Sequence, residues 1–160
     1  MNNLVFSKQD NDKWAKKLPG KMTSACLIII HQNKALMVKA NYKNHWTFPS
    51  GIVDENESPL DAAIRETKEE TNIAVSKSQC SHFCTIFTYS DGDSRDRFNF
   101  AFIAQSLPDT LQIRCNGHEI SSYSWVRLNE IAKKSKYKGS YLILQDLLTN
   151  RISGHYFEVR

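Results

Sequence analysis

Three glutamates crowd one segment near the middle of the chain: Glu66, Glu69 and Glu70. Residues three and four apart lie on the same face of a helix, so a helical segment brings these carboxylates side by side. Like charges at this spacing repel one another, and helix propensity alone does not favour the arrangement. A hard divalent cation, Mg²⁺ or Mn²⁺, relieves the repulsion because it prefers oxygen ligands. The spacing indicates a metal platform for phosphate, with a solvated acidic helix face as the alternative.

The neighbouring residues predict that this segment is helical from Pro59 to Thr71. Ser58 suits the N-cap, and proline suits the first helical position, where an N–H would have no partner. Asp61 complements the positive end of the helix dipole, and Asn72 tolerates the left-handed conformation that ends a helix. Beside the glutamates, apolar groups recur at helical spacing and form the stripe expected to be buried: Leu60, Ala63, Ile64 and the methyl group of Thr67.

With its flanks, this segment resembles the Nudix box, the signature of the Nudix hydrolases, over residues 51–73. The box runs from a glycine through a glutamate, an Arg-Glu pair and a Glu-Glu pair to a final aliphatic residue. The matching residues are Gly51, Glu57, Arg65, Glu66, Glu69, Glu70 and Ile73. Two positions depart from the pattern, because Thr67 replaces an aliphatic residue and Asn72 replaces a glycine. Neither departure removes a carboxylate.

The segment that leads into the box resembles the family's approach of a tryptophan, a proline and two glycines. Here it begins at Trp46 and carries Ser50 in place of the first glycine. The resemblance implies a metal ligand at the backbone carbonyl of Ser50, and serine keeps that carbonyl if the backbone does not need a positive φ. The rings of Trp46 and Phe48 either pack in the core or face the substrate.

An acidic residue beyond the box also matches the family. Glu119 precedes a strand that contains Ser124-Trp125-Val126, where some members carry a further metal ligand or a general base. The alternative for Glu119 is a solvated strand edge. His118 is expected to be a surface residue.

The resemblance implies metal-dependent hydrolysis of a nucleoside diphosphate linked to another group, giving a nucleoside monophosphate and a phosphorylated remainder. The implied metal ligands for Mg²⁺ or Mn²⁺ are Glu66, Glu69, Glu70 and the Ser50 carbonyl. Arg65 is implied to pair with Glu57 and, with Gly51, to orient the loop and the helix. A box glutamate or Glu119 takes the proton from water, and the residues leave that choice open.

The substrate is less determined than the bond. The expected substrate is a small-molecule nucleotide, either a nucleoside triphosphate or a dinucleoside polyphosphate. Tyr89 falls where the diadenosine polyphosphate hydrolases tend to carry a tyrosine that stacks on adenine, although a tyrosine at a strand end is common. The proline typical of the ADP-ribose group is absent between Ile73 and Pro108. The alternative class is a non-catalytic Nudix-like module that senses a nucleotide, and loss of the box carboxylates would be its usual sign.

Composition sets further bounds. The 160 residues suit one domain, residues 1–160. The net charge is +4, yet residues 51–73 carry −5, so the remainder carries +9, which suits a polyphosphate substrate. The basic residues are scattered without a binding motif, which argues against nucleic acid. We expect a cytoplasmic protein with no membrane segment and four reduced cysteines. The oligomeric state stays open, a homodimer included.

The remaining pattern predicts an α+β fold, and the resemblance specifies it as a Nudix-type α/β/α sandwich with a mixed central sheet. Two hairpins are expected, residues 24–31 with 34–40 and residues 83–89 with 97–105. A later strand is expected at 122–126, and helices at 128–134 and 141–148. Residues 1–20 suggest a strand or a short helix that ends at Leu18-Pro19-Gly20.

Overall fold

A mixed sheet runs through the molecule, in the order β6-β2-β1-β5-β4-β7, with the short strand β3 also paired to β1. The computed structural model describes residues 7–90, 92, 95–105, 107, 110–136, 138–152 and 154–160. The strands are β1 (Met22–His31), β2 (Lys34–Ala40), β3 (Ser50–Ile52), β4 (Cys80–Thr88), β5 (Arg97–Ala104), β6 (Ile120–Arg127) and β7 (His155–Val159). β1 pairs with β5, and β4 with β7, in parallel, whereas the other pairs are antiparallel. The predicted mixed sheet is confirmed.

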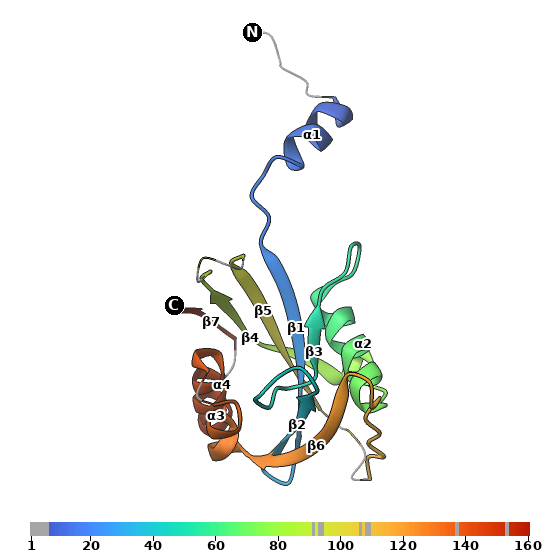
Figure 1. The fold of residues 1–160 in the computed structure, drawn as a ribbon, viewed down its shortest axis with the longest axis vertical. Coiled ribbons are helices and arrows are strands. Elements are labelled where there is room, and N and C mark those ends of the chain that lie inside the picture. The colour runs from blue at the N-terminus through green and yellow to red at the C-terminus, as the bar shows by residue number, and fades with distance from the viewer. Residues whose placement is uncertain are drawn as a thin grey trace.

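Helices cover both faces of this sheet (Figure 1). They are α1 (Lys8–Ala15), α2 (Pro59–Thr71), α3 (Ile131–Lys134) and α4 (Gly139–Asn150), with single 3₁₀ turns η1 (Lys77–Gln79) and η2 (Leu128–Glu130). α2 packs its alanines against Ala25, Leu27 and Ile29 of β1. On the other face, Leu144, Leu147 and Leu148 of α4 pack against Cys26 and Ile28. Because successive residues of β1 alternate between the two clusters, one strand serves both cores.

The box helix begins and ends where the sequence predicts. The Ser58 hydroxyl accepts the Asp61 amide at 3.1 Å, Pro59 is the first helical residue, and Asn72 ends the helix at φ 61°. The β1–β2 hairpin is confirmed as well. Its two turn residues, Gln32 and Asn33, adopt φ values of 47° and 61°, and such turns match the right-handed twist of the strands.

Several elements differ from the expectation. The helix predicted at 128–134 is divided into η2 and α3. β3 and β7 are not anticipated from sequence, because β3 has three residues and β7 is an edge strand whose side chains are largely exposed. Of the alternatives for residues 1–20, the short helix is the one observed, as α1, but it ends at Ala15, before the predicted stop. Residues 1–6 and parts of the loop predicted at 90–94 lie outside the described residues.

α1 stands apart from the rest of the molecule in Figure 1, and none of its residues is buried. Its stability is local, because Ser7 and Asp10 form a capping box at its start. Among the described residues no helix is long and apolar enough to cross a membrane. The four cysteines are all free thiols, as expected.

Candidate active site

Arg65 ties the loop before α2 to the helix itself. Its Nε and Nη2 donate to the two oxygens of Glu57 at 2.8 and 2.9 Å, a two-pronged pair that fixes both side chains. Nη2 also donates to the carbonyl of Ile52 at 3.2 Å. These hydrogen bonds lower the pKa of Glu57 and raise that of Arg65. The loop therefore cannot move relative to α2 without breaking charge-assisted bonds.

The first box glycine makes room for a carboxylate. A Cβ atom on Gly51 would lie 2.0 Å from Oε1 of Glu66, far inside contact distance. The same Oε1 accepts from Nη1 of Arg65 at 2.7 Å. Burial raises the pKa of Glu66, Arg65 opposes the shift, and Glu69 and Glu119 add to it. Glu66 is thus packed against the backbone of β3 and partly neutralised by Arg65.

Glu70 points inward and is almost fully buried, with 4% of its surface exposed. Its Oε2 accepts the backbone amide of Ser50 at 3.1 Å, the single hydrogen bond to this side chain within the described residues. Burial raises the pKa of Glu70 to about 8, and the Ser50 amide opposes this while Glu66 and Glu119 add to it. A cation would favour the charged form that burial disfavours.

Ser50 keeps the backbone geometry that a ligand carbonyl requires. It lies in β3 and is not among the described non-glycine residues with positive φ. The amide and carbonyl of one strand residue project to the same edge, and the Ser50 amide is directed at Glu70. The Ser50 carbonyl is therefore directed to the same side as the Glu70 carboxylate.

The three box glutamates do not converge on one point in this arrangement. Glu69 is the most exposed of them, and its Oε2 accepts a hydrogen bond from Nη1 of Arg65 at 3.3 Å. In the described part of the chain, no group of three acidic, histidine or cysteine side chains is placed so that it could hold a metal. The donor chemistry nevertheless fits a hard cation, since carboxylates that raise one another's pKa are oxygen donors of the kind that such a cation prefers.

Glu119 lies beside the box although it is about fifty residues away in the chain. Its charge is among the causes that raise the pKa of both Glu66 and Glu70. The hydroxyl of Tyr42 donates to its Oε1 at 3.2 Å, and the Asn41 amide donates to its carbonyl at 2.8 Å. His118 is exposed, as expected.

Four lysines gather around His45, and one of them, Lys43, also lies near Glu70; sequence reasoning did not single them out. We call them the lysine cluster: Lys39, Lys43, Lys136 and Lys138. Burial, followed by the positive charges of these four residues, lowers the pKa of His45. The positive charge of Lys43 also opposes the rise in the pKa of Glu70 that burial causes. Two pairs of lysines about a hundred positions apart form the cluster, Lys39 with Lys43 and Lys136 with Lys138. The sequence shows each pair, but not that the fold brings the two pairs together.

The aromatic candidates take different places. Phe48 is fully buried and stacks on Tyr141 with ring centroids 5.5 Å apart, so core packing is the alternative that the structure shows. Trp46 is half-buried, with the Lys134 ammonium 5.2 Å from its ring centroid. The Tyr89 hydroxyl donates to Glu158 at 2.6 Å, and its ring lies under Arg160. Among the described residues, the contacts of Tyr89 come from β4, β7 and the chain end, and none comes from the box.

Tyr141 is a half-buried residue at this site that sequence reasoning missed. Its hydroxyl accepts the amide of Phe48 at 3.2 Å, so α4 holds the segment that leads into β3. The apolar periodicity of the α4 segment could identify a core helix, but not a hydrogen bond to a backbone ninety residues earlier.

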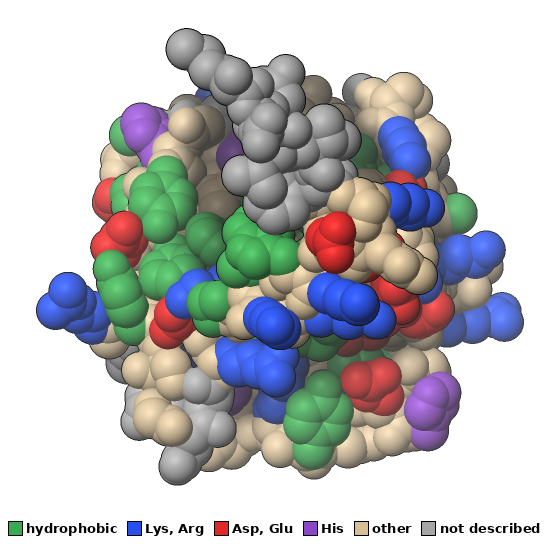
Figure 2. All heavy atoms as spheres, turned by 90° about the horizontal axis from the view of Figure 1, so that it is seen from above, with side chains coloured by type: hydrophobic (Ala, Val, Ile, Leu, Met, Phe, Trp, Pro, Cys, Tyr) green, Lys and Arg blue, Asp and Glu red, His purple; other side chains and the backbone are tan. Residues whose placement is uncertain are grey.

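The face of the molecule that is seen from above in Figure 2 mixes charges. Figure 2 shows Lys and Arg side chains spread across the displayed face, with acidic and hydrophobic side chains between them. They form no continuous basic stripe on that face, which agrees with the scattered pattern in the sequence.

Comparisons with known proteins bear on these residues. A family model described as NUDIX domain matches residues 20–147. The bis(5'-nucleosyl)-tetraphosphatase [asymmetrical] of Caenorhabditis elegans is 33% identical over 105 residues, which cover 64% of this chain and 73% of that protein. The mouse enzyme of the same name is 30% identical over 115 residues, covering 64% and 69%.

Solved structures of similar fold point to the same family as the sequence comparisons. A crystal structure described as a C. elegans Ap4A hydrolase binary complex has a TM-score of 0.62 at 27% identity, covering 81% of this chain and 97% of that one. A MutT Nudix hydrolase from Burkholderia pseudomallei has a TM-score of 0.68 at 17% identity, covering 80% and 98%, which shows the shared fold alone. The chain belongs to the Nudix family and is a hydrolase that acts on pyrophosphate bonds.

Proposed function

We propose that this chain splits dinucleoside polyphosphates asymmetrically, with Mg²⁺ or Mn²⁺ as cofactor. The observation that carries the proposal is the lysine cluster around His45, which adjoins the acidic cluster of Glu66, Glu70 and Glu119 through Lys43. A carboxylate set suits a cation that bridges phosphates, and adjacent lysines suit the phosphates beyond it. A long polyphosphate chain needs both. The tetraphosphatases at 33% and 30% identity favour this substrate over a nucleoside triphosphate.

The residues that would hold the metal are Glu66, Glu69 and Glu70 with the carbonyl of Ser50. When bound, the cation supplies charge neutralisation at the phosphates and increases the acidity of an adjacent water. Glu70 is oriented before any ligand binds, because it is buried and accepts a hydrogen bond from the Ser50 amide. Arg65 holds the loop against the helix through its two hydrogen bonds to Glu57.

The protein side chains then divide the remaining tasks. Glu119, oriented by the Tyr42 hydroxyl, or one of the box glutamates accepts the proton of the attacking water. The lysine cluster binds phosphates of the leaving nucleotide and offsets the charge that develops on it.

Substitution of Glu70 by glutamine tests the proposal. With bis(5'-adenosyl) tetraphosphate and Mg²⁺, we expect kcat to fall roughly 100-fold or more, because a preorganised charge is lost. The amide side chain still accepts the Ser50 N–H, so circular dichroism and Tm should show an intact fold. The matched control is Glu55→Gln, an exposed acid of the same loop, which should retain wild-type turnover. Near-wild-type turnover of Glu70→Gln in saturating Mg²⁺ contradicts the assignment.

A substrate panel tests the specificity. Ion-exchange chromatography of the products should show AMP with ATP, and kcat/KM should be higher for the dinucleoside tetraphosphate than for nucleoside triphosphates or ADP-ribose. A preference for a triphosphate would assign the chain to a MutT-type activity. Tight binding of one nucleotide without turnover of any would favour the sensing module.

A further inference from the structure

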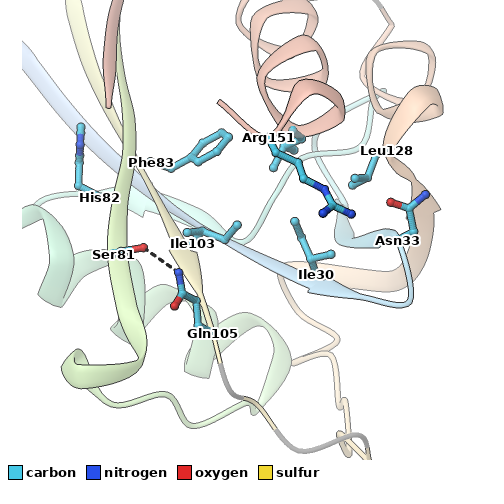
Figure 3. A pocket seen from close by; sticks show the side chains of 10 residues that line it. Ile30, Asn33, Ser81, His82, Phe83, Ile103, Gln105, Leu128 and Arg151 are labelled. Atoms are coloured by element: carbon cyan, nitrogen blue, oxygen red, sulfur yellow. Dashed lines mark hydrogen bonds between the residues drawn. The ribbon is translucent and has the colours of Figure 1, made fainter. Parts of the chain in front are cut away.

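A cavity of about 430 Å³ lies under the C-terminal end of α4 (Figure 3). It is bounded by α4, η2, the β1–β2 turn and the adjoining ends of β4 and β5. α4 contacts the box approach through Tyr141, near its start, whereas Arg151, just after its end, lines the cavity. Ten residues of helix span roughly 15 Å. No box residue is among those that line the cavity, so it is separate from the candidate active site.

The floor of the cavity is apolar. It consists of Ile30, Phe83, Ile103, Leu128 and Leu148. Phe83, Leu128 and Leu148 are more than nine-tenths buried and belong to the core on the α4 side of the sheet. The volume lies in the range of small-molecule sites, about 300–1,000 Å³. An apolar body of moderate size would therefore replace water on this floor.

The rim is polar and carries one cation. Asn33, Ser81 and Gln105 line it, and Gln105 Nε2 donates to Ser81 Oγ at 3.4 Å. Arg151 ends α4 in the left-handed conformation, at φ 56°. Figure 3 shows its guanidinium extended into the space between α4 and the β1–β2 turn, close to Ile30 and Asn33.

Arg151 has no carboxylate partner within the described residues. Arg151 is exposed at the rim, and its guanidinium is weakly hydrated and stays charged at all relevant pH values. His82 also lines the cavity, but it is not the group that we expect to bind an anion there. Its Nε2 is 3.0 Å from Thr85 Oγ1 and its ring packs edge-on against Phe102, which belongs to the α2 side of the sheet.

We propose that this cavity binds a small aryl or alkyl carboxylate. The apolar body lies on the floor, and the carboxylate accepts two parallel hydrogen bonds from Arg151. A single guanidinium matches a planar monoanion, whereas a phosphomonoester would bring two charges to one cation. The volume equals about 14 waters at roughly 30 Å³ each, which suits a body of about a dozen heavy atoms.

Titration of the full-length protein with phenylbutyrate tests the inference. Binding is followed by changes in amide NMR spectra, recorded in EDTA. Without metal or substrate, the result is independent of the proposed function. We expect saturable binding, with the largest shifts at Ile103, Gln105 and Arg151 and smaller shifts at residues 50–70. The uncharged analogue phenylbutanol should bind at least several-fold more weakly, because it lacks the carboxylate.

Variants locate the site. Arg151→Ala should weaken phenylbutyrate binding roughly tenfold or more, since hydrogen bonds to a charged group are lost. The matched control is Arg97→Ala at the opposite end of β5, which should leave binding unchanged. Ile103→Phe, which fills the cavity, should abolish binding of both probes. Shifts centred on the box, or equal binding by wild type and Arg151→Ala, would overturn the proposal.

Discussion

Gly51 shows how one residue type decides the placement of a charge. Glu66 occupies the space that any side chain at position 51 would fill, and Arg65 binds the same oxygen. The requirement for glycine is therefore steric, because the backbone of β3 and a box carboxylate approach each other closely. It does not depend on a positive φ, since Gly51 is absent from the described glycines with that geometry.

Gly51→Ala should displace Glu66 while the fold survives, because the contact is with the far end of a flexible side chain. We expect Mn²⁺ affinity, measured by electron paramagnetic resonance, to fall roughly 10–100-fold. Gly20→Ala is the matched control, since its Cβ would meet only Arg95 at 3.5 Å, an ordinary contact. Unchanged Mn²⁺ affinity in Gly51→Ala would show that Glu66 is not a ligand.

Burial of Glu70 should make the stability of the metal-free protein depend on pH. The pKa of Glu70 is about 8 in the folded state and ordinarily 4.5, so between these values the folded state binds the extra proton. The free energy of unfolding therefore decreases as pH rises from about 4.5 to about 8. Glu70→Gln removes this dependence and should be more stable than wild type at pH 8.5, by a few kcal/mol at most.

Guanidinium denaturation in EDTA at pH 5 and pH 8.5 measures the difference. At pH 5 the two proteins should be nearly equal, because Glu70 is then protonated in the folded state. Parallel pH profiles for wild type and Glu70→Gln would contradict a raised pKa at this residue.

Among the elements, α4 and β7 meet at one crowded contact. A Cβ atom on Gly139, the first residue of α4, would lie 2.6 Å from Cγ1 of Val159 in β7. Helix propensity favours alanine over glycine by at most about 1 kcal/mol, but overpacking costs about 1–3 kcal/mol. The steric effect should therefore decide the sign.

Gly139→Ala should lower the free energy of unfolding by about 1–2 kcal/mol in denaturant titrations. Adding Val159→Ala to this variant removes the clash, so the double variant should lose less than the sum of the two single losses. Additive losses, or a stabilised Gly139→Ala protein, would show that α4 and β7 are not in contact there.

For the molecule as a whole, the two ends of the chain contribute unequally. α1 buries no residue, whereas Phe157 and Val159 of β7 pack against the α4-side core. Removing residues 1–19 should leave Tm within about 2 °C and retain turnover. Removing residues 154–160 should lower Tm by several degrees, since 1 kcal/mol corresponds to roughly 2–4 °C at this size. Differential scanning calorimetry of both truncations distinguishes these outcomes, and a large loss from the first would mean that α1 docks on the body.

At this scale, residues distant in sequence also build the site. The acidic cluster comes from α2 and the residue before β6, and the lysine cluster from the segments around β2 and before α4. Opposite charges therefore lie near one another, with Lys43 beside Glu70, although the chain as a whole is only mildly basic, with a net charge of +4.

The sequence by itself determined α2, its boundaries and the spacing of its glutamates. Those features rest on short-range physics: a serine cap, a proline at the first position, apolar residues at helical spacing and an asparagine that accepts a positive φ. The two hairpins and the mixed α+β architecture followed from alternation and turn residues in the same way.

The tertiary structure decided where each carboxylate points and what surrounds it. Helical spacing places Glu66, Glu69 and Glu70 on one face, but only packing buries Glu70 under Ser50 and leaves Glu69 exposed. Only the sheet brings Glu119 beside them, and only the turn after α4 directs Arg151 over an apolar floor. Burial and charge proximity depend on contacts between residues far apart in the chain, which local propensities do not encode.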